Sequence, residues 1–130
     1  MEILTDIINL IHDLGYSCSI DDFGSGYSSL NILKNIPVDT IKIDRGFFIG
    51  ENSDTVKSDT IVRSVIDLAR KLKMKTVSEG IEYKDQVEFL KEAKCDMIQG
   101  YYFSKPIPIT EFEKLAFGLE KKKKRILPSE

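Results

Sequence analysis

The hydrophobic spacing switches repeatedly between a helical period and short apolar runs, and this alternation constrains the fold more than any other feature. Residues 2–14 place apolar side chains at helical spacing, and Gly15 follows as a helix terminator. The remaining pattern predicts strands at 16–20, 40–43, 74–78 and within 96–103, and helices at 27–36, 57–72, 84–93 and 108–120. One helix followed by four strand–helix units predicts an α/β fold whose parallel sheet is wrapped by helices.

Three local details accompany this prediction. The polar stretch 50–59 is expected to be a loop, and the helix after it places Ile61 and Leu72 on its buried side with the other apolar residues of that segment. Thr110 is the expected N-cap of the last helix, ahead of an acidic first turn.

A polar residue stands near the end of each predicted strand. The carboxyl ends of parallel strands meet at one edge, where sites form in both doubly wound sheets and barrels. No glycine-rich phosphate loop of the Rossmann or P-loop type is present, so a barrel fits better than an open sheet. Four strands make a (βα)₄ half of a TIM-type (β/α)₈ barrel, which in full needs about 250 residues. The residues in question are Asp21, Asp22, Lys42, Asp44, Glu79, Glu82 and Gln99.

Two of these residues, Asp21 and Asp22, are adjacent. Side chains alternate faces along a regular strand, so the two cannot both point the same way. We expect one to point into the barrel mouth at a metal while the other reaches up from the strand end. Gly24 and Gly26 follow at once and allow the backbone to turn tightly and pass close to the site.

Carboxylate and amide oxygens gathered at one rim suit Mg²⁺, Mn²⁺ or Ca²⁺, and the chain has no Cys/His set of the kind that binds zinc. The alternative for any single acid is a solvated loop carboxylate, but it is weaker for four strands in succession. Lys42 would orient a water or a phosphate oxygen; its alternative is a salt bridge to Asp44 or Asp22. The single histidine, His12, lies near the apolar stripe of its helix and is expected to be structural.

Charge and composition exclude several classes of function. The net charge of −2 includes five basic residues at 121–125; without residues 121–130, 14 basic residues face 20 acidic ones, a net of −6. An acidic domain argues against nucleic-acid binding. No window is apolar enough to span a membrane, and two distant cysteines indicate a reduced, cytoplasmic setting. We expect a domain at residues 1–119 and a basic tail at 120–130.

Four blocks in order carry a resemblance to a known family: DDFGSG from Asp21, KID from Lys42, EGIE from Glu79 and QGYYFSKP from Gln99. Together they closely resemble the C-terminal half of EAL domains, the bacterial phosphodiesterases specific for cyclic di-GMP. The resemblance runs over about residues 1–115. It implies a barrel of the (β/α)₈ type that converts cyclic di-GMP to linear pGpG with Mg²⁺ or Mn²⁺.

The resemblance also implies roles for individual residues. Asp21 matches a ligand of the catalytic metals, and Asp22 matches a residue that serves the second metal and ties the following loop to the site. Lys42 matches the lysine that positions the attacking water, and Glu79 matches the glutamate that assists the water or the metal-bound groups. The remaining rim positions are matched by Glu82 and Gln99, the latter near the water and substrate.

The Glu-Ala-Leu segment that names the family does not occur in these 130 residues, nor do the nearby arginine and the Asn and Glu ligands of the next strands. We therefore expect weak metal affinity and background hydrolysis from the chain alone. A half barrel exposes two sheet edges and its apolar inner face, so we expect a homo-oligomer. Three functions stay open: part of a cyclic di-GMP phosphodiesterase, a non-catalytic dimerising or regulatory module derived from one, and a generic α/β segment. The intact blocks argue against the third.

Overall fold

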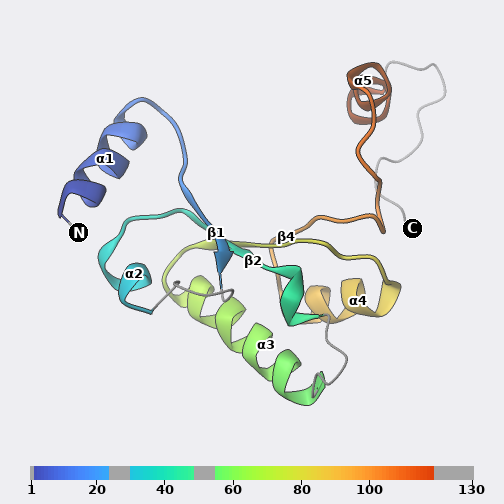
Figure 1. The fold of residues 1–130 in the computed structure, drawn as a ribbon, viewed down its shortest axis with the longest axis horizontal. Helices are drawn as coiled ribbons and strands as arrows, with labels where there is room; N and C mark the ends of the chain where they lie inside the picture. Colours follow the sequence, from blue (N-terminus) through green and yellow to red (C-terminus); the bar gives the residue numbers. More distant parts are fainter. Residues whose placement is uncertain (1, 24–29, 49–54, 119–130) are drawn as a thin grey trace.

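The computed structural model describes residues 2–23, 30–48 and 55–118. Within these ranges the predicted alternation is confirmed: a helix is followed by four strand–helix units (Figure 1). The strands are β1 (Ser19–Phe23), β2 (Thr40–Ile43), β3 (Lys75–Ser78) and β4 (Met97–Ile98). The helices are α1 (Glu2–Asp13), α2 (Leu30–Asn35), the short 3₁₀ helix η1 (Arg45–Phe47), α3 (Thr55–Lys71), α4 (Lys84–Glu92) and α5 (Ile109–Phe117).

The four strands form one sheet in the order β1-β2-β3-β4, and every neighbouring pair is parallel. The pairing of β2 with β3 is regular over four residues, from Thr40 opposite Lys75 to Ile43 opposite Ser78. Because all strands run the same way, the residues that follow them gather along one edge of the sheet. This edge carries the candidate functional residues.

The main core lies between the sheet and the helices that follow β2 and β3. Ile41 and Ile43 of β2 are fully buried, as are Val62 and Ile66 of α3 and Leu90 of α4. Figure 1 shows α2, α3 and α4 on the same side of the sheet. The opposite side chains of β2 and β3 therefore face away from these helices, since strand side chains alternate.

The first and last helices contribute little to the core. Ile8 is the buried residue of α1, packed near Ile36 and Val38, and α5 has no buried residue among those described. Gly15 ends α1 as predicted: its φ is +87°, its N–H donates to His12 O, and Tyr16 N–H donates to Ile11 O. This pair of hydrogen bonds is a Schellman motif. Both helices stand away from the layer of α3 and α4 (Figure 1).

Several predicted boundaries were wrong. The first strand is Ser19–Phe23 rather than 16–20, so both aspartates lie within it. Residues 55–59 of the expected loop already belong to α3. Ile61 and Leu72 are 48% and 44% exposed rather than buried, because α3 offers the sheet only the narrow stripe of Val62, Ile66 and Ala69.

Thr110 is not the N-cap of α5. The helix already begins at Ile109, after Pro108, and the Pro108 carbonyl accepts hydrogen bonds from the N–H groups of Glu111 and Phe112. Pro108 is the N-cap residue and has no side-chain acceptor, so α5 begins without a side-chain cap. The predictions for Gly24 and Gly26 and for the tail at 120–130 lie outside the described residues.

None of the helices in the described ranges combines the length and the apolar character that a bilayer crossing requires.

Candidate functional site

A β-bulge sets the geometry of the site. Ile20 of β1 pairs with Ile41 and Phe23 pairs with Ile43, so the two residues Asp21 and Asp22 lie opposite the single residue Lys42. Asp22 takes up the extra residue with a left-handed φ of +50°, a conformation that Asp and Asn tolerate better than other non-glycine residues.

The bulge corrects the expectation that the two aspartates point to opposite faces. After it, Phe23 returns to the helix-covered side and is 7% exposed. The carboxylates of Asp21 and Asp22 lie together instead, each with an oxygen within 4.8 Å of the other and of Glu79. A non-glycine residue with a left-handed φ stores local backbone strain, and strain of this kind is concentrated at binding sites.

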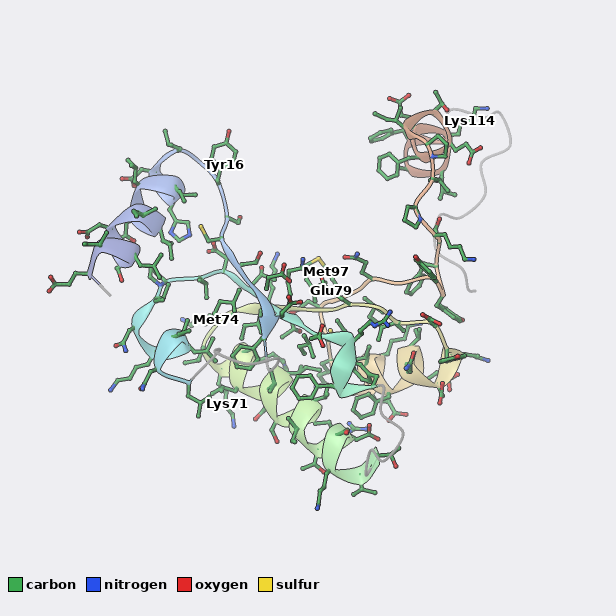
Figure 2. All side chains as sticks on the ribbon, viewed as in Figure 1. Tyr16, Lys71, Met74, Glu79, Met97 and Lys114 are labelled. Carbon is green, nitrogen blue, oxygen red and sulfur yellow. The ribbon has the colours of Figure 1, made fainter. Side chains whose placement is uncertain are left out.

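Lys42 and Glu79 reach this cluster by strand alternation. Ile41 and Ile43 face the helices, so Lys42 between them faces the open side of the sheet. Ser78 likewise is fully buried, so Glu79 after it turns to the same open side. Figure 2 shows Glu79 at the level of the strands, midway between the two end helices.

The Lys42 ammonium joins the acidic groups. Its Nζ lies 2.6 Å from Glu79 Oε1 and 3.5 Å from Asp21 Oδ1. The sequence offered a salt bridge to Asp44 or Asp22 as the alternative, but Lys42 pairs with Asp21 and Glu79 instead. The bulge in β1 brings Asp21 close to the ammonium, and the end of β3 brings Glu79 close to it.

The charges of the cluster act on one another. The Asp21 carboxylate raises the pKa of Asp22 above its ordinary value, with smaller contributions from burial, Asp44 and Glu79 and an opposing one from Lys42. The hydrogen bond to Glu79 raises the pKa of Lys42, so this side chain stays protonated at neutral pH. The site is thus crowded with negative charge that a single ammonium offsets only in part.

This donor set fits a hard divalent cation. Three carboxylates from two strand ends offer the oxygen ligands that Mg²⁺ and Mn²⁺ prefer, and the mutual repulsion is the state that a bound cation relieves. Asp21 is 65% exposed at its side chain and Glu79 only 21%, so the cluster opens to solvent on the Asp21 side.

Asp44 has a local structural role. Its carboxylate accepts a hydrogen bond of 2.7 Å from the Gly46 N–H and caps η1, directly after β2. It still contributes to the field at Asp22. The structure therefore supports Asp44 as a residue beside the cluster.

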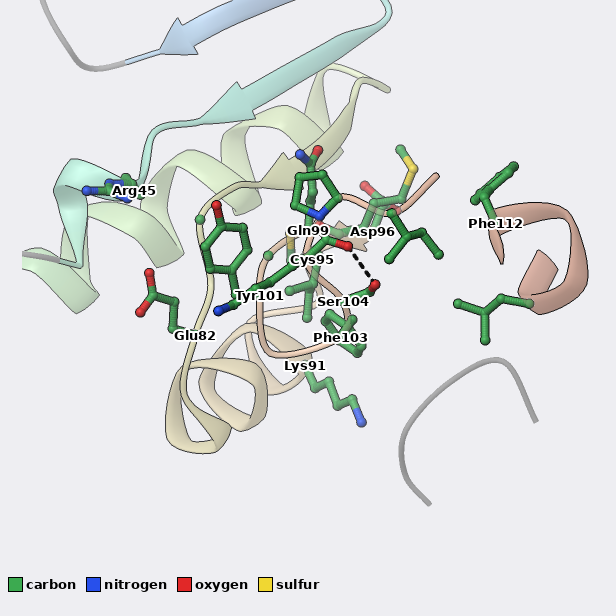
Figure 3. A pocket seen from close by; sticks show the side chains of 18 of the residues that line it. Arg45, Glu82, Lys91, Cys95, Asp96, Gln99, Tyr101, Phe103, Ser104 and Phe112 are labelled. Atoms are coloured by element: carbon green, nitrogen blue, oxygen red, sulfur yellow. Dashed lines mark hydrogen bonds between the residues drawn. The ribbon is translucent and has the colours of Figure 1, made fainter. Parts of the chain in front are cut away.

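Glu82 and Gln99 lie in a second feature, a cavity of about 1220 Å³ beside β4. Figure 3 shows both in its wall, with Arg45 on the same side and Phe112 of α5 across the hollow from Tyr101. The structure thus divides the predicted residues between two places. Asp21, Asp22, Lys42 and Glu79 are in direct contact or close approach, whereas Glu82 and Gln99 line the neighbouring cavity.

Sequence reasoning missed two glycines and one cation. Gly80 has a φ of +70°, and a Cβ there would lie 2.6 Å from the Arg45 side chain; at Gly100 a Cβ would collide with the Ile81 backbone. Each follows a functional-looking residue, Glu79 or Gln99, and that spacing was the available signal. Arg45 lies in η1, directly after the KID block, and lines the cavity beside β4; no pattern in the sequence pointed to it.

These features define the class of protein. The four parallel strands alternating with helices match part of a TIM-type barrel, and the EAL domain of Mycobacterium smegmatis DcpA superposes with a TM-score of 0.82 at 38% identity over 90% of this chain and 52% of that one. The PaMucR phosphodiesterase in complex with c-di-GMP gives a TM-score of 0.75 at 39% identity, over 83% of this chain and 43% of that one.

The family model of the EAL domain matches residues 1–106, and the chain belongs to this family. Among curated relatives, it is 41% identical over 107 residues to the cyclic di-GMP phosphodiesterase NbdA of Pseudomonas aeruginosa, covering 82% of this chain and 14% of NbdA. It is 39% identical over 122 residues to the probable cyclic di-GMP phosphodiesterase PdeG of Escherichia coli, covering 94% of this chain and 24% of PdeG. The chain therefore spans a quarter or less of these relatives' lengths.

Proposed function

We propose that this chain supplies part of the active site of a cyclic di-GMP phosphodiesterase that yields linear pGpG. The observation that carries the proposal is the bulge that sets Asp21 and Asp22 opposite Lys42 and within reach of Glu79. The names of the relatives support the substrate, and the hard-oxygen donor set supports a divalent metal. A bacterial signalling role in the cytoplasm is part of the same proposal.

Each residue has a chemical role in this proposal. Asp21 and Asp22 would hold Mg²⁺ or Mn²⁺, which when bound would polarise the phosphate and increase the acidity of a water. Lys42, kept protonated by Glu79, donates hydrogen bonds that orient a water or a phosphate oxygen. Glu79 would accept a proton from that water, and Gln99 and Glu82 would contact substrate from the cavity wall.

The 130-residue chain alone is expected to hydrolyse cyclic di-GMP only at background rate. The chain spans only 52% and 43% of the two EAL structures compared above. The proposal therefore includes further ligands from strands beside β1 or β4. In this proposal residues 1–119 form the domain and residues 120–130 form its basic tail.

A chimera tests the proposal. Residues 1–106 replace the matching segment of the NbdA phosphodiesterase, and pGpG formation is followed by chromatography with Mn²⁺ present. We expect activity near that of NbdA, and a loss of about 100-fold or more when Asp21→Asn, Lys42→Met or Glu79→Gln is introduced. The matched control is Asp67→Asn, which removes an exposed carboxylate paired with Lys71 on α3. An inactive chimera that folds and binds Mn²⁺ would contradict the proposal, as would full activity of the three site variants.

The second candidate is a non-catalytic module that self-associates. It is favoured by the exposure of apolar side chains on both end helices, such as Ile3 at 77% and Ile109 at 72%. We propose that the chain forms a homo-oligomer through these regions and the adjacent sheet edges. Sedimentation at micromolar concentration tests it, and a clean monomer would count against it.

A further inference from the structure

The side chain of Arg45 lies directly against the backbone of Gly80. Arg45 belongs to η1, just after β2, and Gly80 follows Glu79 just after β3. A Cβ atom at position 80 would lie 2.6 Å from Arg45 Cβ, 2.7 Å from its Cδ and 3.1 Å from its Cγ, all closer than the roughly 3.5–4.0 Å of an ordinary carbon–carbon contact. The carbon chain of Arg45 therefore occupies the space that a side chain at position 80 would need, and the contact joins two neighbouring strand ends.

The local structure of η1 fixes the backbone from which the Arg45 side chain starts. Asp44 caps η1, and its Oδ2 accepts a hydrogen bond of 2.7 Å from the Gly46 N–H, on the other side of Arg45. The Phe48 N–H donates to the Arg45 carbonyl at 2.8 Å, and the Phe48 ring packs edge to face against Phe89 of α4. The short helix that carries Arg45 is thus held at both of its ends.

The segment that Arg45 contacts carries one carboxylate of the candidate metal cluster. Glu79 has an oxygen within 4.8 Å of oxygens of Asp21 and Asp22, and these like charges repel one another. The next residue, Gly80, has a φ of +70° and no Cβ, so its backbone can adopt many conformations. A repelled carboxylate beside a glycine can turn away from the cluster unless the space beside that glycine is filled.

We propose that Arg45 is a positioning residue, whose carbon chain fills the space beside Gly80 and so keeps the Glu79 carboxylate against Lys42. The 2.6 Å between Lys42 Nζ and Glu79 Oε1 depends on how the ends of β2 and β3 lie relative to each other, and the Arg45–Gly80 contact joins these two ends. Because carbon atoms make the contact, the effect does not require the guanidinium charge. The catalytic consequence rests on the proposed function, in which Glu79 acts on the attacking water.

Amide hydrogen exchange of the 130-residue chain, followed by NMR, tests the contact without metal or substrate. Arg45→Ala removes two of the three Arg45 atoms that lie nearest to position 80. The Glu79 N–H, which donates to the Ile43 carbonyl at 3.1 Å, should then exchange at least about 10-fold faster. The N–H of Thr76, earlier in β3, should keep its rate, so a general loss of stability is recognised as an equal change at both sites.

Two further variants control this measurement. Arg45→Gln keeps Cβ, Cγ and Cδ but removes the charge, so the Glu79 N–H should exchange within about twofold of the unmodified rate. Arg70→Ala removes an exposed arginine at the end of α3 and should change neither rate. An unchanged Glu79 rate in Arg45→Ala would overturn the proposal, and so would equal acceleration by the alanine and glutamine variants.

The NbdA chimera described above tests the catalytic consequence. Arg45→Ala should lower both kcat and the affinity for Mn²⁺, measured by electron paramagnetic resonance, by about 10-fold or more, with KM for cyclic di-GMP within about twofold. Arg45→Gln should stay close to the unmodified chimera. The alternative is direct contact between substrate and the guanidinium, which lies in the wall of the cavity beside β4 (Figure 3).

The outcomes separate these possibilities. A raised KM with an unchanged kcat, or equal losses in Arg45→Ala and Arg45→Gln, would show that the guanidinium contacts substrate and would overturn the positioning role. An unchanged kcat in an Arg45→Ala chimera would overturn it as well. An inactive unmodified chimera would contradict the proposed function instead, and hydrogen exchange would still decide whether Arg45 holds Glu79 in place.

Discussion

The centre of the molecule and its two end helices differ sharply in how they are packed. Around β2 and β3, residues such as Ile43, Ile66 and Leu90 are completely buried. Helices α1 and α5 together have one buried residue, Ile8, although both are amphipathic. The same kind of strand–helix unit is therefore complete in the middle of the chain and open at its margins.

This difference follows from the way a parallel sheet is built. A helix that connects two strands packs over both: α3 shares a core cluster with Ile41 and Ile43 of β2 and also contacts β3. Helices α1 and α5 each lie beside a strand that, within the described residues, is paired on one side only. The fully buried side chains are therefore concentrated at the centre, whereas the margins keep apolar side chains such as Ile3 and Ile109 exposed. The candidate metal cluster takes Asp21 and Asp22 from β1, at the margin, and Glu79 from the end of β3, at the centre.

The largest effect is expected from a core truncation. Ile66→Ala removes a fully buried side chain from the contact between α3 and the sheet and should lower the free energy of unfolding by about 2–5 kcal/mol. Leu14→Ala, a matched truncation of an exposed residue directly after α1, should change it by less than about 0.5 kcal/mol. Urea denaturation measures both, and equal losses would erase the distinction between centre and margin.

Loss of a buried hydrogen-bonded contact at the centre should have the next largest effect on the free energy of unfolding. The Asp96 carboxylate accepts hydrogen bonds from the N–H and hydroxyl of Thr76, which is fully buried. Asp96→Ala leaves these donors without that acceptor and should cost about 2 kcal/mol. Asp96→Asn retains an acceptor oxygen and should cost less. A loss no greater for alanine than for asparagine, again by urea denaturation, would contradict this role.

The corresponding hydrogen-bonded contact at the margin, which holds α1, is weaker, and its strength depends on pH. Asp39 accepts hydrogen bonds from the Cys18 N–H at 2.7 Å and pairs with His12 of α1 at 2.8 Å. The Cys18 N–H first, and then His12, lower the pKa of Asp39. Its stabilising contribution is therefore present above the unfolded value near 3.9 and is lost as pH falls through the lowered folded pKa.

Asp39→Asn should cost about 1 kcal/mol at neutral pH, because the site is partly exposed and screened. The difference between the two proteins should shrink below about pH 4. Thermal unfolding across pH 2–7 checks this, with Asp67→Asn as a surface ion-pair control that should lose less. A difference that grows with acidity would have the wrong sign.

The smallest expected effect is in the cluster itself, where one substitution should raise the stability of the fold. The pKa of Asp22 is raised in the folded state, so repulsion lowers stability as pH rises above about 4. Asp22→Asn removes that repulsion and keeps a residue that tolerates the left-handed φ. We expect a small rise in the thermal midpoint in EDTA, and a smaller rise on adding millimolar Mn²⁺ than the unmodified chain shows. A lower midpoint in EDTA would contradict the account of the cluster.

The sequence predicted the regular parts of the fold and the identity of the clustered residues. Apolar periodicity located β2 to the residue, because Ile41 and Ile43 alternate around Lys42. It did not predict the bulge, which depends on pairing between β1 and β2 and on the backbone of Asp22. For the same reason the alternative interpretation of Lys42, a salt bridge to Asp44 or Asp22, named the wrong partners, because Glu79 comes from the end of a different strand. The N-cap prediction at Thr110 was wrong because α5 begins one residue earlier, at Ile109, directly after Pro108.

The critical experiment is an assay of Mn²⁺-dependent pGpG formation from cyclic di-GMP by the 130-residue chain alone, with sedimentation on the same sample. Because the cluster of Asp21, Asp22, Lys42 and Glu79 is proposed to share its site with further ligands, we expect background turnover. Robust Mn²⁺-dependent cleavage by a monomer of this chain would contradict it.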